Sequence, residues 1–215
     1  MGTLPKESST TIDELVNQAE EIGRNVVTRE RVEADKNGAW VSESMRALQK
    51  ENLTALVVPK ESGGLGKGLF ALARVCETLG KFYSSVGLCF GMHCVGTAVI
   101  AAKATSWQKQ NYLARIAEGK HITTLALSEP GTGAHFYIPQ TSLMPISEKT
   151  FLINGGKTFV TNGGHADSYV ISTMAATHDA NPEHFSCIVL DADTSGIHWG
   201  GEWNGLGMRG NSSRL

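Results

Sequence analysis

The hydrophobic pattern of this chain changes its period near Lys120. Before that residue, apolar positions recur every three or four residues, as they do in residues 11–35. After it, apolar residues come in short runs typical of strands, beginning with Ile122–Ser128. A helical half followed by a strand half favours an α+β fold of two domains, residues 1–121 and 122–215, over alternating βαβ units.

Local signals divide the first half into helices. Capping-box patterns mark two helix starts, at Thr11 with Glu14 and at Thr105 with Gln108. The helix after Thr105 is predicted to end at Gly119, since glycine commonly ends helices. The other helices of this half are expected at residues 40–51, 68–80 and 83–103.

The second half carries turn signals between its apolar runs. Asn154-Gly155 is a strong hairpin signal, so Phe151–Asn154 and Lys157–Thr161 are predicted to pair through it. Further strands are expected at Tyr169–Ala176, Phe185–Leu190 and Ile197–Trp203. No helix is expected after residue 120.

Charge and hydropathy exclude two broad classes of partner. The 19 basic and 21 acidic residues leave a net charge of −2, without the clustered basic face of a nucleic-acid binder. The longest apolar stretch, Val86–Ala102, is interrupted by glycines and His93, whereas a membrane span needs about 20 predominantly apolar residues. We therefore expect a buried core helix there, no membrane span and no nucleic-acid partner.

The cysteines and the N-terminus favour a cytoplasmic protein. The four cysteines lack the spacing of a zinc site, and we expect them to be reduced, buried thiols. They are Cys76, Cys89, Cys94 and Cys187. The polar N-terminus lacks the basic leader and apolar run of a secretory signal.

Two motifs in the helical half are interpreted as structural. The loop Gly63-Gly64-Leu65-Gly66 lacks the Lys-Ser/Thr pair of a phosphate-binding P-loop, so it is predicted to be a turn. His93 has no carboxylate or second histidine nearby in the sequence, which favours a core histidine over a metal ligand. No metal site is predicted.

Two polar loops carry the functional signal of the chain. Ser128–Gly133 follows an apolar strand and presents small residues and backbone N–H groups. Lys157–Gly163 presents Phe159 close to the hydroxyl of Thr161. Backbone donors bind an anionic heterocycle and an aromatic ring covers its face, so together the loops favour such a ligand.

Five segments in order resemble the acyl-CoA dehydrogenase family. They are Val58–Gly66, Gln108–Gly119, Ala126–Gly133, Leu152–Gly163 and Gly205–Gly210. The resemblance implies a helical N-terminal domain and a middle, antiparallel β-barrel domain that holds one side of FAD. The family's C-terminal four-helix domain is expected to be absent, and the barrel to be incomplete at Leu215.

The resemblance also implies cofactor-binding residues on both loops. They are Leu125, Ala126, Leu127, Ser128, Gly133, Ala134, Phe159, Val160 and Thr161. Backbone groups of residues 125–128 and the Ser128 hydroxyl would face the pyrimidine edge of the flavin. Phe159 would lie against the ring system, and Thr161 would lie near N5, the atom that accepts hydride.

The implied reaction is oxidation of the α–β bond of an acyl-CoA thioester to the 2-enoyl-CoA, in fatty-acid and lipid metabolism. A carboxylate of the C-terminal domain is the family's base, so no catalytic residue is expected in this chain, and Glu129 is interpreted as shaping its loop. The expected partners are the acyl-CoA substrate, electron-transfer flavoprotein and further copies of the chain, in the family's homotetramers or dimers.

The chain departs from the family signature at Ala134-His135, where Ser or Thr followed by Asp is usual. The family's serine contacts the CoA part of the substrate, and Ala134 has no hydroxyl. Both residues are therefore substrate-binding candidates, with altered substrate handling as the hypothesis. Two alternatives stay open: a flavin-dependent monooxygenase or oxidase of the same fold, and a non-catalytic flavin- or acyl-CoA-binding module.

Overall fold

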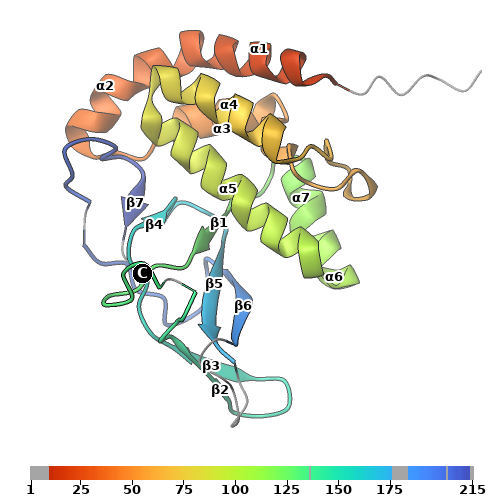
Figure 1. Ribbon diagram of the computed structural model, residues 1–215, viewed down its shortest axis with the longest axis vertical. Helices are drawn as coiled ribbons and strands as arrows, with labels where there is room; N and C mark the ends of the chain where they lie inside the picture. The colour runs from red at the N-terminus through yellow and green to blue at the C-terminus, as the bar shows by residue number, and fades with distance from the viewer. Residues whose placement is uncertain (1–9, 136, 176–183, 202, 214–215) are drawn as a thin grey trace, which may run out of the picture.

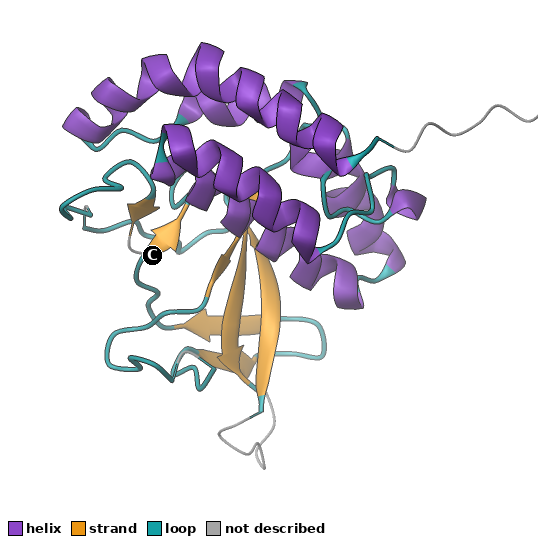
Figure 2. Ribbon diagram, turned by 45° about the horizontal axis from the view of Figure 1, so that its top comes forward, coloured by secondary structure: helices purple, strands orange, loops and turns teal. Residues whose placement is uncertain are grey.

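The computed structural model describes residues 10–135, 137–175, 184–201 and 203–213. Helices form one side of the molecule and strands the other (Figures 1 and 2). The longer helices are α1 (Ile12–Ile22), α2 (Thr28–Asn37), α3 (Ser42–Lys50), α4 (Leu69–Phe82) and α5 (Ser84–Lys103). Short α and π-helical segments are η1 (Gly23–Val27), α6 (Ser106–Gln108), η4 (Lys109–Leu113) and α7 (Ala114–Ala117), and 3-10 turns are η2 (Leu53–Ala55) and η3 (Lys60–Ser62). The predicted order of helices then strands is confirmed.

Both predicted capping boxes are present. The Thr11 amide donates to Glu14 Oε2 at 2.6 Å, and the Glu14 amide donates to Thr11 Oγ1 at 3.2 Å. The same reciprocal pair joins Thr105 and Gln108. The helix that starts there ends as expected at Gly119, whose φ of 68° lies in the left-handed region favourable to glycine.

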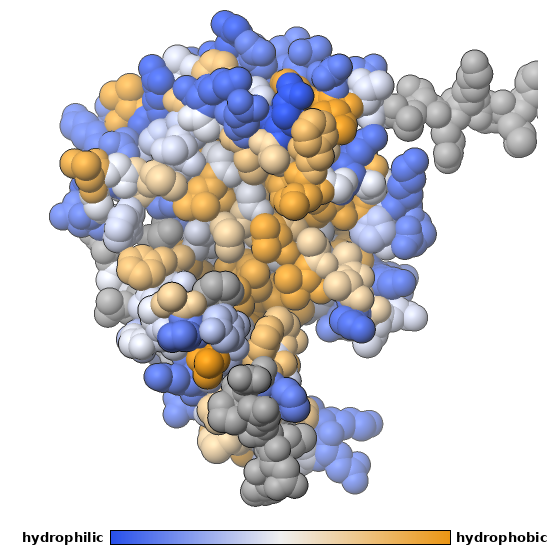
Figure 3. Space-filling view, viewed as in Figure 1, coloured by the Kyte–Doolittle hydropathy of each residue, from blue (hydrophilic) through white to orange (hydrophobic). Residues whose placement is uncertain are grey.

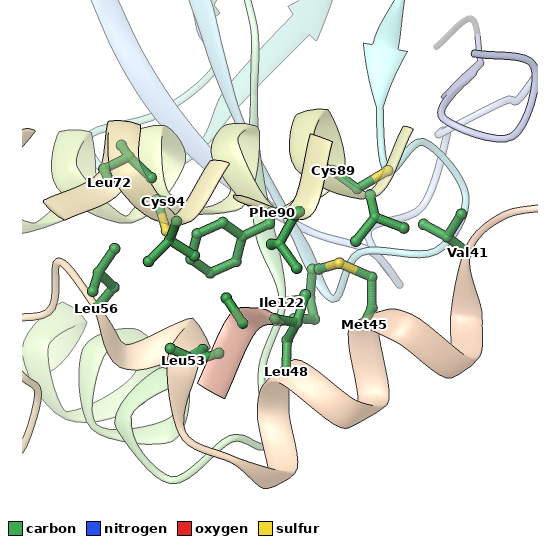
Figure 4. Close-up of a cluster of buried hydrophobic side chains, with 14 of the residues drawn as sticks. Val41, Met45, Leu48, Leu53, Leu56, Leu72, Cys89, Phe90, Cys94 and Ile122 are labelled. Atoms are coloured by element: carbon green, nitrogen blue, oxygen red, sulfur yellow. The ribbon is translucent and has the colours of Figure 1, made fainter. Parts of the chain in front are cut away.

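Helix α5 lies in the core, between α4 and the strands (Figure 1). It is long and apolar enough to cross a membrane, the only such helix in the described ranges, but slightly more than half of that stretch is buried inside the molecule. Phe90 of α5 meets Leu53 and Leu56 in a buried apolar cluster (Figure 4). A core helix satisfies the same length and composition, so the predicted core helix is confirmed.

Within the described ranges, the strands form three small sheets. In the largest, β1 (Thr123–Ala126) pairs in parallel with β5 (Ser168–Met174), which pairs antiparallel with β6 (Phe185–Asp191). Two antiparallel pairs complete the set: β2 (Ser142–Pro145) with β3 (Phe151–Asn154), and β4 (Val160–Thr161) with β7 (Ser212–Ser213). These sheets do not close, so the barrel is not confirmed, and β1–β5 is a parallel exception to the expected antiparallel pattern.

The predicted hairpin through Asn154-Gly155 is wrong. Strand β3 pairs with the unpredicted β2 on its N-terminal side, and β4 pairs with β7. An added Cβ at Gly155 would lie 2.4 Å from Thr141 Oγ1, so this glycine permits a close approach rather than a hairpin turn. Described residues of the predicted strand Ile197–Trp203 are likewise not in a strand.

The motifs interpreted as structural have structural contacts. Gly63 and Gly66 have φ values of 86° and 59°, and the amide of Gly66 donates to Val58 O at 2.8 Å, which makes the loop a tight turn. His93 is fully buried, with Nε2 3.0 Å from Thr54 O and Nδ1 3.1 Å from the amide of Thr123. Within the described ranges, no cluster of three potential metal ligands is present.

The four cysteines are free, but their burial differs from the prediction. Cys89 and Cys94 are buried and Cys76 is half-buried, as expected for side chains on packed helices. Cys187 is exposed, because it lies on β6, which has a neighbouring strand on only one side within its sheet. The expectation of burial is therefore wrong for Cys187.

Candidate functional site

The two polar loops lie side by side, although about thirty residues separate them in the sequence. The first leaves the end of β1, and the second leads into β4. A backbone hydrogen bond of 2.8 Å from the Thr158 amide to Ser128 O joins them directly. The fold thus assembles one surface from the segments that carried the functional signal.

A buried ion pair lies at the point where the loops meet. Lys157 Nζ is 2.5 Å from Glu129 Oε1, and the two side chains are only 2% and 3% exposed. The ammonium also donates to Ser172 O at 2.6 Å and to Ser172 Oγ at 3.0 Å. Burial alone would raise the pKa of Glu129, but hydrogen bonds from Lys157 and Thr141 outweigh it and hold this pKa below its usual value.

Glu129 also fixes the far end of its own loop. Its carboxylate accepts hydrogen bonds from the amide of Gln140 at 2.6 Å and from the hydroxyl of Thr141 at 2.7 Å. We call Glu129, Lys157, Thr141 and Ser172 the loop clamp. These bonds agree with the interpretation of Glu129 as a loop-shaping residue. Lys157 was missed as a site residue. Its one signal in the sequence is that it begins the second loop, as Glu129 lies near the start of the first.

The tip of the first loop is open. Gly131 and Gly133 have φ values of 87° and 52°, and an added Cβ at either would meet nothing within 4 Å. The amides of Gly133 and Ala134 donate no hydrogen bond to any described residue. Such an open, glycine-rich loop has free donors for an anionic or electron-rich ligand.

The predicted site residues fall into a buried and an accessible set. Ala126, Val160 and Thr161 are buried, and Leu125, Leu127 and Ser128 are half-buried. Gly133, Ala134, His135 and Phe159 are exposed. The hydroxyls of Ser128 and Thr161 make no hydrogen bond to any described residue, and neither is sealed from solvent. Both remain available to a ligand.

Phe159 is 63% exposed and has a φ of 54°, an unusual backbone conformation for a bulky residue. The indole of Trp203 meets its ring edge-on, with centroids 5.6 Å apart. An exposed ring, two free hydroxyls and an open loop of amides fit the isoalloxazine of a flavin, which needs a flat apolar face and donors along one edge.

The second loop is anchored to the helical half by Asn162, which was also not predicted as a site residue. Trp40 Nε1 donates to Asn162 Oδ1, and Asn162 Nδ2 donates to Cys89 O, both at 2.9 Å. The Trp40 ring stacks on His165, with centroids 4.7 Å apart. Only the position of Asn162 directly after Thr161 offered a sequence signal for this anchor.

His135, the second substrate-binding candidate, lies on the open side of the first loop. Its Nδ1 is 3.1 Å from the hydroxyl of Tyr137, and the two rings meet edge-on with centroids 5.8 Å apart. The exposed pair presents an aromatic surface, with an imidazole where the family signature has an acid.

The comparisons with known proteins cover both halves of the chain. The profile "Acyl-CoA dehydrogenase, N-terminal domain" matches residues 9–120, and "Acyl-CoA dehydrogenase, middle domain" matches residues 124–215. An acyl-CoA dehydrogenase of Bacillus subtilis (strain 168) is 27% identical over 180 residues, which are 83% of this chain and 47% of that protein. The chain spans about half the length of the curated relatives it matches.

Solved structures share the fold. Butyryl-CoA dehydrogenase from Megasphaera elsdenii superposes with a TM-score of 0.85 at 22% identity, covering 100% of this chain and 56% of that one. Acyl-CoA dehydrogenase complexed with FAD from Bacillus anthracis gives a TM-score of 0.78 at 22% identity, covering 99% and 36%. With profile matches along nearly the whole sequence, the chain belongs to the acyl-CoA dehydrogenase family.

Proposed function

We propose that this chain provides the flavin-binding face of an FAD-dependent acyl-CoA dehydrogenase, which oxidises the α–β bond of an acyl-CoA thioester to the 2-enoyl-CoA. The hydrogen bond between Thr158 and Ser128 carries the proposal, because it joins the two loops into one surface beside the exposed ring of Phe159. Membership of the family and the FAD complex of a relative support it.

Each group on this surface has a proposed part. When bound, FAD supplies the two-electron acceptor for the substrate hydride. The Ser128 hydroxyl and nearby amides donate hydrogen bonds where negative charge grows, which favours the reduced form. Phe159 would cover one face of the bound ring and exclude water, and Thr161 would hold the flavin through its hydroxyl.

The base that removes the α-proton is proposed to come from outside this chain. Glu129, the carboxylate within the first loop, is buried, and both of its oxygens accept hydrogen bonds. A base must reach the proton that it abstracts, and a carboxylate held in this way is not free to do so.

FAD titration tests the cofactor part of the proposal. The chain should retain FAD after excess is removed, and Phe159→Ala should weaken binding about tenfold, since ring stacking contributes about 1 kcal/mol beyond buried area. Phe70→Ala is the matched control, because Phe70 is similarly exposed, at 66%, but lies on α4. No retained FAD, or equal affinities in the two variants, would contradict the proposal.

The residues Ala134 and His135 support a change in substrate handling. We expect Ala134→Ser with His135→Asp, in the active enzyme, to shift affinity and preference toward ordinary acyl-CoA substrates. Unchanged preference would refute this part. The same departure at Ala134 and His135 keeps an oxidase or monooxygenase as the second candidate function. An enzyme of that kind should show rapid reoxidation of its reduced flavin by oxygen, whereas a dehydrogenase should reoxidise slowly.

The proposed partners are acyl-CoA, an electron-transfer flavoprotein as electron acceptor, and further copies of the chain in a cytoplasmic homotetramer. Figure 3 shows an apolar area in the middle of one face, between the hydrophilic outer helices and the strand half. Contiguous apolar surface of this kind favours burial against another protein layer. Light scattering that finds only monomer in the complete enzyme would contradict the oligomer.

A further inference from the structure

A pocket lies at the opposite end of β1 from the two polar loops of the proposed flavin site. It has a volume of about 370 Å³, and its walls come from the helical segment of residues 106–117 and from the ends of β5 and β6. It is lined by His121, two residues before β1, by Asp167, directly before β5, and by Asp191, at the end of β6. Nothing in the flavin proposal uses these residues.

His121, one of the lining residues, has a buried acceptor without a hydrogen-bond partner. Its side chain is buried, at 2% exposure, and Nε2 is 2.8 Å from Ser168 Oγ. Ser168 Oγ donates its own proton to Thr123 Oγ1 at 2.9 Å, so it must accept from Nε2–H of His121. The lone pair on Nδ1 is then left without a partner. Burial lowers the pKa of His121, which keeps the ring neutral and Nδ1 an acceptor.

The neighbouring carboxylates also have acceptor capacity left. Asp167 Oδ2 accepts from the amide of Ile122 at 2.7 Å, and Asp191 Oδ1 accepts from the hydroxyl of Tyr112 at 3.0 Å. The second oxygen of each makes no hydrogen bond to a described residue, and Asp193 adds a third carboxylate to the lining. Unpaired, negatively charged acceptors favour a ligand that carries positive charge and several hydrogen-bond donors.

The lining of this pocket suits an organic cation better than a metal ion. These carboxylates and His121 do not approach one another closely enough to form a three-ligand metal cluster, within the residues that the structure describes. The pocket is also much larger than one ion, and Trp107, 60% exposed and edge-on to Tyr112, offers an indole face at its rim. An indole face attracts ammonium groups.

We propose that this pocket binds a small organic cation that carries ammonium groups, held by Asp167, Asp191 and Nδ1 of His121 beneath Trp107. Arg115 is also in the lining and forms no ion pair with a described residue. Its positive charge limits how many positive charges a ligand of this pocket can carry. The ligand would bridge the helical half and the strand half. The site is independent of flavin binding.

Calorimetric titration of the chain with putrescine, a diammonium probe, tests the proposal at physiological ionic strength. Saturable binding at one site is expected for the unaltered chain. Asp191→Asn keeps a side-chain oxygen that accepts from the Tyr112 hydroxyl, but it replaces the unpaired carboxylate oxygen by an NH₂ donor. Asp167→Asn makes the same change and keeps the bond from the Ile122 amide. Each should weaken binding at least tenfold, while thermal unfolding checks that both variants remain folded.

Glu77→Gln is the matched control, because it removes one exposed carboxylate from α4, where Glu77 contacts Arg74 and Lys81. It should bind putrescine as the unaltered chain does. Absence of saturable binding would overturn the proposal and leave the pocket to water. Equal weakening in Glu77→Gln and the two aspartate variants would also overturn it, since the binding would then be non-specific attraction to surface charge.

Discussion

Phe90 and Lys157 are both almost fully buried, yet one is surrounded by apolar side chains and the other by oxygen atoms. Around Phe90, stability comes from removing apolar surface from water, which depends on volume and tolerates small changes in shape. Around Lys157, it comes from matching each donor to an acceptor, and loss of one partner leaves a buried charge. The helical half is thus held by apolar packing, and the two polar loops are held by paired charges and hydrogen bonds.

The largest effect is expected where the packing is broken. Phe90→Ala should lower the free energy of unfolding by about 4 kcal/mol, because it removes buried surface and leaves a cavity. Phe70→Ala, at an exposed ring, should change it by less than about 0.5 kcal/mol. Urea unfolding measures both. Similar losses in the two variants would contradict the assignment of Phe90 to the core.

The next largest loss of stability is expected where the buried ion pair of Glu129 and Lys157 is broken. Lys157→Met should cost about 3 kcal/mol, because it leaves the buried carboxylate of Glu129 without its cation. The double variant Glu129→Gln/Lys157→Met should recover part of that loss, as it removes the uncompensated charge. If urea unfolding finds the double variant no more stable than Lys157→Met alone, the stated origin of the loss is wrong.

A pH titration sharpens the comparison at His93, which belongs to the packed half but is held by hydrogen bonds. Burial lowers the pKa of His93 from 6.5 to about 4, so the unfolded chain binds a proton in a range where the folded chain does not. Its contribution to stability is complete above pH 6.5 and should fall by about 2 kcal/mol on going to pH 5.

Denaturant unfolding at several pH values checks this expectation. His93→Gln should flatten the dependence on pH, whatever its effect on stability at neutral pH. Parallel curves for the unaltered chain and His93→Gln would assign the dependence to other groups.

The smallest effect is expected at the contact between the two halves. Trp40→Phe keeps a ring to stack on His165 but removes the hydrogen bond to Asn162, at a cost of about 1 kcal/mol. It should also weaken FAD retention slightly, because Asn162 ends the second loop. Trp107→Phe is the control, since the Trp107 indole nitrogen bonds to no described residue. Equal unfolding midpoints in both variants would count against the anchor.

Local signals in the sequence were sufficient for much of the helical half. The capping boxes at Thr11 and Thr105 and the end at Gly119 depend on residues only a few positions apart, and all three are present. The core helix followed from an apolar stretch that neighbouring helices and strands cover. These features are decided by short-range geometry and by simple burial.

Local sequence signals could not predict which strands pair or that the loop clamp forms. Whether β3 pairs with β2 or with β4 depends on contacts between distant segments, and Gly155 imitates a turn residue while it serves a close approach to Thr141. Lysine is normally exposed, so nothing local predicts a buried Lys157. The adjacency of the two loops came from the family resemblance, and the contacts that fix them required the structure.

The loop clamp has a consequence for how this protein can diversify. Glu129 bonds to both Lys157 and Thr141, so the base of its loop is fixed independently of the residues at the tip. Ala134 and His135 lie on that open tip. In the proposed enzyme, exchanging them would therefore alter what meets the substrate without moving the strand ends that hold the loop. Under the proposed function, substitutions at the tip could change the substrate preference of a descendant protein while the fixed base of the loop, and the groups proposed to bind flavin there, stay in place.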